Sequence, residues 1–114
     1  MNERIDSRNI ISDYIFFSKY SRVKPDGKKE SWTEAVSRVM QMHHEFLFNQ
    51  IDEDKKEDFY KVFNEAWNAY NEQLILGSQR SLQYGGPQLL KNNSRSFNCS
   101  GSYCNRIEIF KELM

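Results

Sequence analysis

Cysteine and proline are scarce in this chain, which has two residues of each type among its 114. The two cysteines, Cys99 and Cys104, lie near the C-terminal end, and they are too few to supply all the ligands of a closed zinc site. In a reducing compartment such a pair is rarely a structural disulfide. We therefore expect no structural metal here, and any importance of the two thiols should be chemical.

The chain also lacks an excess of charge and a long apolar run. Sixteen basic residues balance sixteen acidic ones, so no overall positive field favours nucleic acid or an anionic membrane surface. Residues 1–30 contain no apolar run of signal-peptide length, and no segment approaches the length of a membrane span. These absences predict a cytoplasmic protein of at most one small domain, with neither nucleic acid nor a membrane as a partner.

The first 30 residues predict one element and one turn. Residues 1–20 begin polar and then carry a rough helical stripe of apolar side chains, which we assign as a helix. The aromatic and β-branched residues 14–17 would also suit a short strand, so that alternative stays open. Residues 24–28 have the composition of a turn, because proline fixes φ and glycine tolerates positive φ.

Two longer helices are expected next. Ser31 and Glu34 have the spacing of a capping box, and apolar side chains then repeat at three and four residues to about residue 49. A third helix is expected over residues 54–76, with acidic residues in its first turn and Gly77 as the residue that ends it. The short link between the two helices predicts that they pack antiparallel.

The composition changes after Gly77. Residues 78–105 are rich in Gly, Ser and Asn and show no helical stripe, which predicts an ordered loop with at most one short strand over residues 97–102. Long loops are usually functional or disordered, and glycine, hydroxyl and amide groups suit a polar ligand such as a nucleotide. From the residues alone, a binding loop and a plain connector remain equally open.

A last helix is expected from Arg106 onward, capped by Asn105 and Glu108. Its apolar positions continue to the last residue, Met114, which predicts that this end assembles with a second chain.

His43 and His44 are adjacent in the second predicted helix. Neighbouring side chains on a helix point about 100° apart, so the two rings cannot chelate one metal ion without further ligands. We expect one ring to be half-buried and the other solvated, with no metal at either.

The C-terminal third resembles a known family in three stretches: Ser78-Gln79-Arg80-Ser81-Leu82-Gln83-Tyr84-Gly85-Gly86, Asn92-Asn93, and Phe97-Asn98-Cys99-Ser100. They resemble the entry to the catalytic barrel of ribonucleotide reductases, particularly the adenosylcobalamin-dependent class. Two upstream stretches, Tyr20-Ser21-Arg22 and Glu30-Ser31-Trp32-Thr33-Glu34-Ala35-Val36, and the final stretch Ile109–Met114 are similar to family segments in the same order. One departure is Gly77, where the family often has proline.

The resemblance implies roles for three residues. Cys99 matches the cysteine of the first barrel strand, which supplies one of the two reducing thiols beneath the ribose. Ser78 matches a hydroxyl residue that contacts the substrate, and Asn98 is expected to line the same floor through its backbone. Cys104 matches no family role, and we expect it to be a small buried apolar residue.

The resemblance also implies a domain division. Residues 1–76 form a helical N-terminal domain, and residues 77–114 form the substrate-site loop, the first barrel strand and the start of the next helix. The remaining catalytic residues of the family would lie outside this sequence, so an α/β barrel completed by a second polypeptide is implied, as is inactivity of the isolated chain.

The implied ligands are a ribonucleotide substrate and, as a further partner, a nucleotide effector. Adenosylcobalamin would be bound by the other polypeptide, with a dimetal radical-generating subunit as the alternative radical source. A different class of function, a small helical interaction module without enzymatic activity, remains open beside this one.

Overall fold

The computed structural model describes residues 7–97, 99, 101 and 103–112. Its elements are α1 (Ser7–Lys19), α2 (Trp32–Phe48), the 3-10 turn η1 (Glu53–Lys55), α3 (Lys56–Asn71), α4 (Gln79–Tyr84), α5 (Pro87–Lys91), the 3-10 turn η2 (Asn93–Ser96) and α6 (Ile109–Glu112). The described residues form no β-strand and contain one isolated bridge, between Val23 and Lys29. The predicted mostly α-helical architecture is therefore confirmed.

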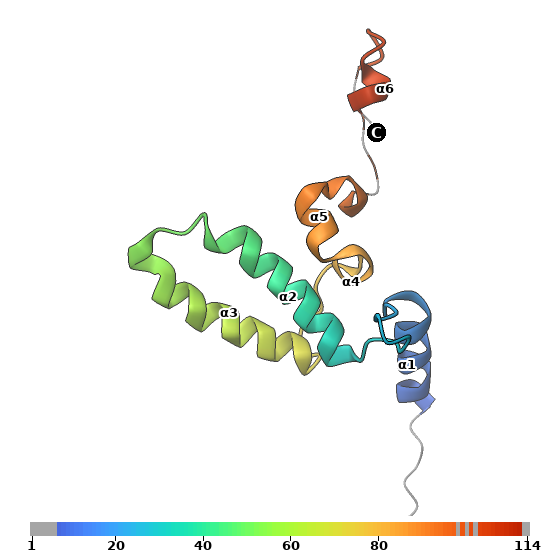
Figure 1. Cartoon of the computed structure of the whole chain (residues 1–114), viewed down its shortest axis with the longest axis vertical. Helices are drawn as coiled ribbons and strands as arrows, with labels where there is room; N and C mark the ends of the chain where they lie inside the picture. The colour runs from blue at the N-terminus through green and yellow to red at the C-terminus, as the bar shows by residue number, and fades with distance from the viewer. Residues whose placement is uncertain (1–6, 98, 100, 102, 113–114) are drawn as a thin grey trace, which may run out of the picture.

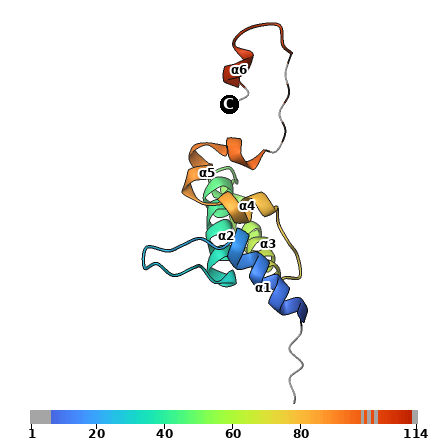
Figure 2. The ribbon, with the colours of Figure 1, turned by 90° about the vertical axis from the view of Figure 1, so that its right-hand side faces the viewer.

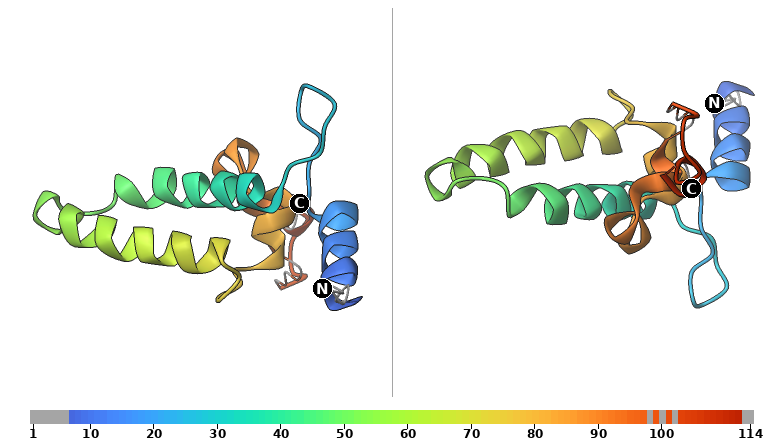
Figure 3. Two further views of the ribbon diagram at one scale, coloured as in Figure 1. Left: turned by 90° about the horizontal axis from the view of Figure 1, so that it is seen from below. Right: turned by 90° about the horizontal axis from the view of Figure 1, so that it is seen from above.

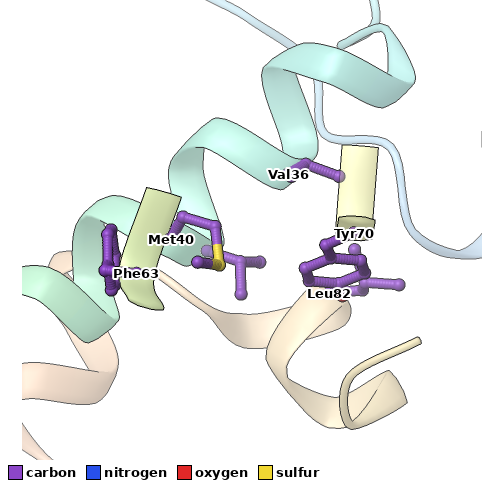
Figure 4. Packing of buried hydrophobic residues seen from close by; sticks show 6 residues of the cluster. Val36, Met40, Phe63, Tyr70 and Leu82 are labelled. Atoms are coloured by element: carbon purple, nitrogen blue, oxygen red, sulfur yellow. The ribbon is translucent and has the colours of Figure 1, made fainter. Parts of the chain in front are cut away.

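An antiparallel hairpin of α2 and α3 forms the body of the molecule (Figures 1 and 3). Val36 and Val39 of α2 are 0% and 1% exposed, and Phe63 and Tyr70 of α3 are buried against them. Leu82 of α4 packs against these residues and belongs to the same cluster (Figure 4). Apolar residues that recur every three to four positions along α2 and α3 therefore make the core, as their periodicity predicted.

The molecule is elongated. Its radius of gyration is 18.3 Å, whereas a compact domain of this length has a radius of about 13 Å. Figures 1 and 2 both show α6 standing apart from the other helices. Helix α1 exposes much of its apolar stripe as well, including Ile10, Ile11 and Tyr14, which are 56%, 59% and 74% exposed.

The capping box that opens α2 is confirmed. The Ser31 hydroxyl accepts the Glu34 backbone N–H at 3.3 Å, and the Glu34 carboxylate accepts the Ser31 N–H at 2.8 Å. Lys24 also donates to Glu34 at 2.8 Å, and this hydrogen bond is the main reason why the pKa of Glu34 falls to about 2. Lys24 belongs to the predicted turn, which the Lys24 and Lys28 backbones close with a hydrogen bond of 2.8 Å.

Replacing Ser31 by alanine should lower the free energy of unfolding by about 1 kcal/mol, the usual cost of losing a helix N-cap. Thr33→Ala is the matched control, because Thr33 is an exposed hydroxyl residue in the same first turn. Urea titration followed by circular dichroism measures both. Equal stabilities of the two variants would contradict a contribution from the cap.

The C-terminal end of α3 differs from its prediction. The helix ends at Asn71 rather than Leu76, and Gln73, at φ 60°, takes the left-handed position expected for Gly77. The Leu74 N–H donates to the Ala69 carbonyl at 2.9 Å and the Gln73 N–H to the Tyr70 carbonyl at 3.1 Å. This pair of bonds is a Schellman motif, which satisfies the last carbonyls of a helix.

The loop expected after Gly77 contains two short helices, α4 and α5, and the turn η2. Each is too short to show a helical stripe in the sequence. Helix α4 is held by burial of Leu82, which is 5% exposed. Helix α5 begins where Gly86, at φ 137°, lets the chain turn and Pro87 occupies the first helical position.

Two expectations concern the last 18 residues: the start of the final helix is corrected, and the strand stays a prediction. Helix α6 begins at Ile109 rather than Arg106, so Asn105 and Glu108 do not cap it as expected. The strand expected over residues 97–102 includes Asn98, Ser100 and Ser102, which lie outside the described residues; Phe97, Cys99 and Gly101 belong to no regular element.

Candidate functional site

A buried ion pair anchors the N-terminal turn to α2. Glu30 and Arg38 have side chains that are only 11% and 13% exposed, and the guanidinium of Arg38 contacts both carboxylate oxygens at 2.9 Å. The Glu30 backbone N–H donates to the Arg22 carbonyl at 2.8 Å, and the Ser21 hydroxyl donates to the Glu30 carbonyl at 2.6 Å. The stretch around Arg22 is thereby fixed against the first turns of α2.

The same guanidinium holds the end of α4. Arg38 donates to the Gly85 carbonyl at 2.8 Å and to the Leu82 carbonyl at 3.0 Å. Arg22 donates to the Gln83 carbonyl at 3.1 Å. The last carbonyls of a helix have no partner within the helix, so two arginines from distant parts of the chain satisfy them and position α4.

Gly85 fits this contact because it has no side chain. A Cβ at Gly85 would lie 2.3 Å from the Ser81 carbonyl oxygen and 3.2 Å from the Val39 side chain. The backbone after α4 can therefore approach α2 closely only with glycine at this position.

Ser78 lies at the start of α4, on a polar cavity of about 510 Å³. The cavity is lined by Lys19, Tyr20, Ser78, Gln79, Arg80, Gln83 and Tyr84. The Ser78 side chain makes no capping hydrogen bond to α4. A hydroxyl beside two cationic side chains, Lys19 and Arg80, gives this cavity the chemistry of a site for a polar anionic ligand.

A second cavity, of about 500 Å³, also includes Tyr84 in its lining. It is lined by Arg22, Tyr84, Gln88, Leu89, Asn92, Ser94 and Arg95. Burial, followed by the nearby charge of Arg38, lowers the pKa of Arg22, and the attraction of Glu30 opposes these effects. Tyr84 thus lines two cavities, each with two cationic side chains. Arg80 lies over its ring at 5.7 Å.

The cysteines are not brought to either cavity. Cys99 and Cys104 are exposed free thiols, and neither lines the cavity of Ser78 or that of Arg22. The expectation that Cys104 is buried is therefore wrong, because its side chain is exposed. Asn98 lies outside the described residues.

Neither histidine is fully solvated, which corrects the expectation for the pair. His43 is half-buried, and burial lowers its pKa. His44 stacks on Phe48 with ring centroids 5.0 Å apart and lies 5.5 Å from the Phe63 ring, so it is part of the aromatic packing between α2 and α3. Within the described part of the chain, no three His, Cys, Asp or Glu side chains gather as a metal site would require.

Comparison with known proteins identifies the family. The profile of the family described as "Ribonucleotide reductase alpha domain" matches residues 2–80. This chain belongs to the ribonucleotide reductase alpha domain family. A protein of Mycobacterium phage D29, described as an adenosylcobalamin-dependent ribonucleoside-triphosphate reductase, is 31% identical over 88 residues, or 76% of this chain. No solved structure matches.

The chain spans only 11% of the length of the phage reductase that it matches. The ribonucleotide reductase profile includes Ser78 and ends two residues later, so it does not reach Cys99. The profile therefore covers α1, α2 and α3 and the start of α4, together with the Glu30–Arg38 ion pair that positions α4.

The resembling stretches of the sequence include most of the residues around Ser78 and Tyr84, among them Tyr20 and Gln83. The sequence gives no signal for Lys19, which is the last residue of α1. It also does not show that these residues lie on one cavity. The role of Arg38 had no such signal, because an arginine in α2 reads as an ordinary solvated position.

In the described part of the chain, no helix is both long and apolar enough to cross a bilayer.

Proposed function

We propose that this chain is the N-terminal part of a ribonucleotide reductase catalytic subunit and reduces ribonucleotides only together with the rest of the catalytic barrel. In this proposal Ser78 contacts the substrate, Asn98 lines the same floor, and Cys99 supplies one of two reducing thiols. The structural observation that supports it is the polar cavity that Ser78 lines together with Lys19 and Arg80.

The charge and polarity of that cavity suit a nucleotide. Ammonium and guanidinium groups form charge-assisted hydrogen bonds with phosphate oxygens, and hydroxyl and amide groups bond to a ribose or base. Four lining residues belong to α4, and hydrogen bonds from Arg38 and Arg22 to the carbonyls at its end position that helix. A rigid support is what a substrate site requires of its scaffold.

The chemistry assigned to Cys99 is a two-electron reduction. The ribonucleotide gains two electrons and loses a hydroxyl group as water, while two thiols lose two electrons and close a disulfide. Cys99 is exposed and unpaired in this chain, so its thiol is accessible for this role. The second thiol comes from the partner polypeptide, and a dithiol reductant then reopens the disulfide.

The partner is proposed because the described residues do not enclose the site. Cys99 and Ser78 do not share a cavity, and α1 and α6 expose large apolar side chains, including Ile11, Tyr14 and Phe110. A second polypeptide that covers these surfaces would bury apolar area and complete the site. We place the assembly in the cytoplasm, where its nucleotide substrates are.

The described residues do not fit adenosylcobalamin. The cofactor carries a corrin ring as well as a nucleotide, whereas four cavities of the described residues have volumes of about 430 to 530 Å³, the size of a small-ligand site. If the assembly uses adenosylcobalamin, as the description of the phage D29 relative suggests, the partner polypeptide binds it. A dimetal radical-generating subunit is the alternative.

The test is reconstitution with the polypeptide that continues the catalytic subunit, which the adjacent reading frame should encode. Mixed with this chain, it should give one stable complex by size-exclusion chromatography and form deoxynucleotides, with neither chain active alone. Two separate elution peaks and no activity would count against the proposal and favour a helical interaction module instead.

A further inference from the structure

The cavity beside Arg22 and Arg95 contains an excess of positive charge. No carboxylate lines it, whereas two guanidinium groups do. In the part of the chain that the structure describes, Arg95 has no ion pair, and it is exposed at the edge of η2. The cavity is therefore electrostatically suited to an anion.

Glu30 does not neutralise this charge fully. Both of its oxygens are bonded to Arg38 at 2.9 Å, and one of them also accepts the Arg22 backbone N–H at 3.3 Å. One carboxylate thus faces two guanidinium groups, and that of Arg38 is the more deeply buried. Among the described residues, the side chain of Arg22 donates to the Gln83 carbonyl at 3.1 Å. Burial and repulsion from Arg38 lower the pKa of Arg22. A buried cation without its own counter-ion is expected to shift in this direction.

The other polar lining residues carry groups that can donate hydrogen bonds. Asn92 uses its side-chain oxygen to accept the Ser94 N–H at 3.0 Å, which leaves its NH2 group to donate. Gln88 and the Ser94 hydroxyl lie on the same cavity, as does the ring of Tyr84. Two guanidinium groups with amide and hydroxyl donors form the donor set that recognises phosphate oxygens.

We propose that the cavity lined by Arg22, Gln88, Asn92 and Arg95 binds a phosphate-bearing anion, either the phosphates of a nucleotide or a free polyphosphate. This cavity and that of Ser78 share Tyr84 but have different cationic side chains, Arg22 and Arg95 in the one and Lys19 and Arg80 in the other. The proposal does not rest on the reductase function, because it follows from the charges and donors of this cavity alone.

The test measures binding of tripolyphosphate and of ATP to the full chain by isothermal titration calorimetry. Arg95→Gln should weaken both about ten- to a hundredfold, as expected for the loss of a charge-assisted contact. Arg95 is exposed, so this variant should keep the circular dichroism spectrum of the parent. Lys61→Gln on α3 is the control for the change in net charge and should leave both affinities unchanged, because Lys61 lines neither cavity.

A third variant, Arg80→Gln, separates the two cavities. Weakening by Arg95→Gln but not by Arg80→Gln supports the proposal, and NMR shifts of the Gln88 and Asn92 side-chain amides on titration should agree with it. Weakening by Arg80→Gln alone would overturn it and place the anion in the cavity of Ser78. Equal weakening by all three variants would also overturn it, since only net charge would then matter. Equal affinities for tripolyphosphate and ATP would identify the phosphates alone as the recognised group, and tighter ATP binding would identify a nucleotide.

Discussion

Replacing Glu30 by alanine is expected to lower the free energy of unfolding by about 3–5 kcal/mol, the usual cost of removing one partner of a buried ion pair. The Glu30 carboxylate is 11% exposed and bonded twice to Arg38. Without it, the Arg38 guanidinium stays buried near Arg22 with no opposite charge. The loss is large against the total stability of a small domain, about 5–15 kcal/mol.

Glu57→Ala is the matched control. It removes the same side chain from an ion pair with Lys61, but Glu57 is 85% exposed, and exposed pairs contribute only about 0.2–1 kcal/mol. Urea unfolding compares the two variants with the parent. A loss below about 1 kcal/mol in Glu30→Ala would show that the buried pair does not stabilise the fold.

Glu30→Ala should also weaken the hydrogen bonds that hold the end of α4, and hydrogen exchange measures this effect residue by residue. Arg38 holds the Leu82 and Gly85 carbonyls through the geometry that Glu30 imposes on its guanidinium. Hydrogen exchange at the Gly85 amide, which donates to the Ser81 carbonyl at 2.7 Å, should therefore accelerate in Glu30→Ala. The amides in the middle of α3 should change only as much as the global stability does.

The helical hairpin could be predicted because its signals are local. The capping box needs residues three positions apart, and the apolar stripes of α2 and α3 repeat within one or two turns. The end of α3 was missed for a physical reason. A Schellman motif needs a residue that tolerates positive φ, and Gln73 adopts that conformation although Gly77 is the better candidate by residue type.

The scaffold of the candidate site could not be predicted, because it is built from contacts between distant residues. Arg38 and Gly85 are 47 positions apart, and Arg22 and Gln83 are 61 apart. Neither arginine has a local pattern that distinguishes it from a solvated one. Helices α4 and α5 have six and five residues, too few for a periodic stripe, so tertiary contacts decide their structure. The composition of residues 78–105 and the family resemblance indicated a functional segment, but neither indicated its helices.

Cys99→Ser is expected to abolish multiple turnover in the reconstituted complex, which is the largest effect that the proposed function predicts. Serine is close to cysteine in shape but cannot form the disulfide that each reduction requires. Nucleotide binding should remain, because the cavity of Ser78 does not include residue 99. The assay is steady-state deoxynucleotide formation with a chemical dithiol as the reductant, and nucleotide affinity is measured alongside.

Cys104→Ser is the matched control, since it makes the same change five residues later at an exposed free thiol. An exposed substitution of this kind alters stability by less than about 0.5 kcal/mol, so turnover should stay near that of the parent complex. Near-normal turnover in Cys99→Ser would rule out the role assigned to its thiol. Loss of turnover in Cys104→Ser alone would transfer that role to Cys104, whose thiol is equally accessible in this chain.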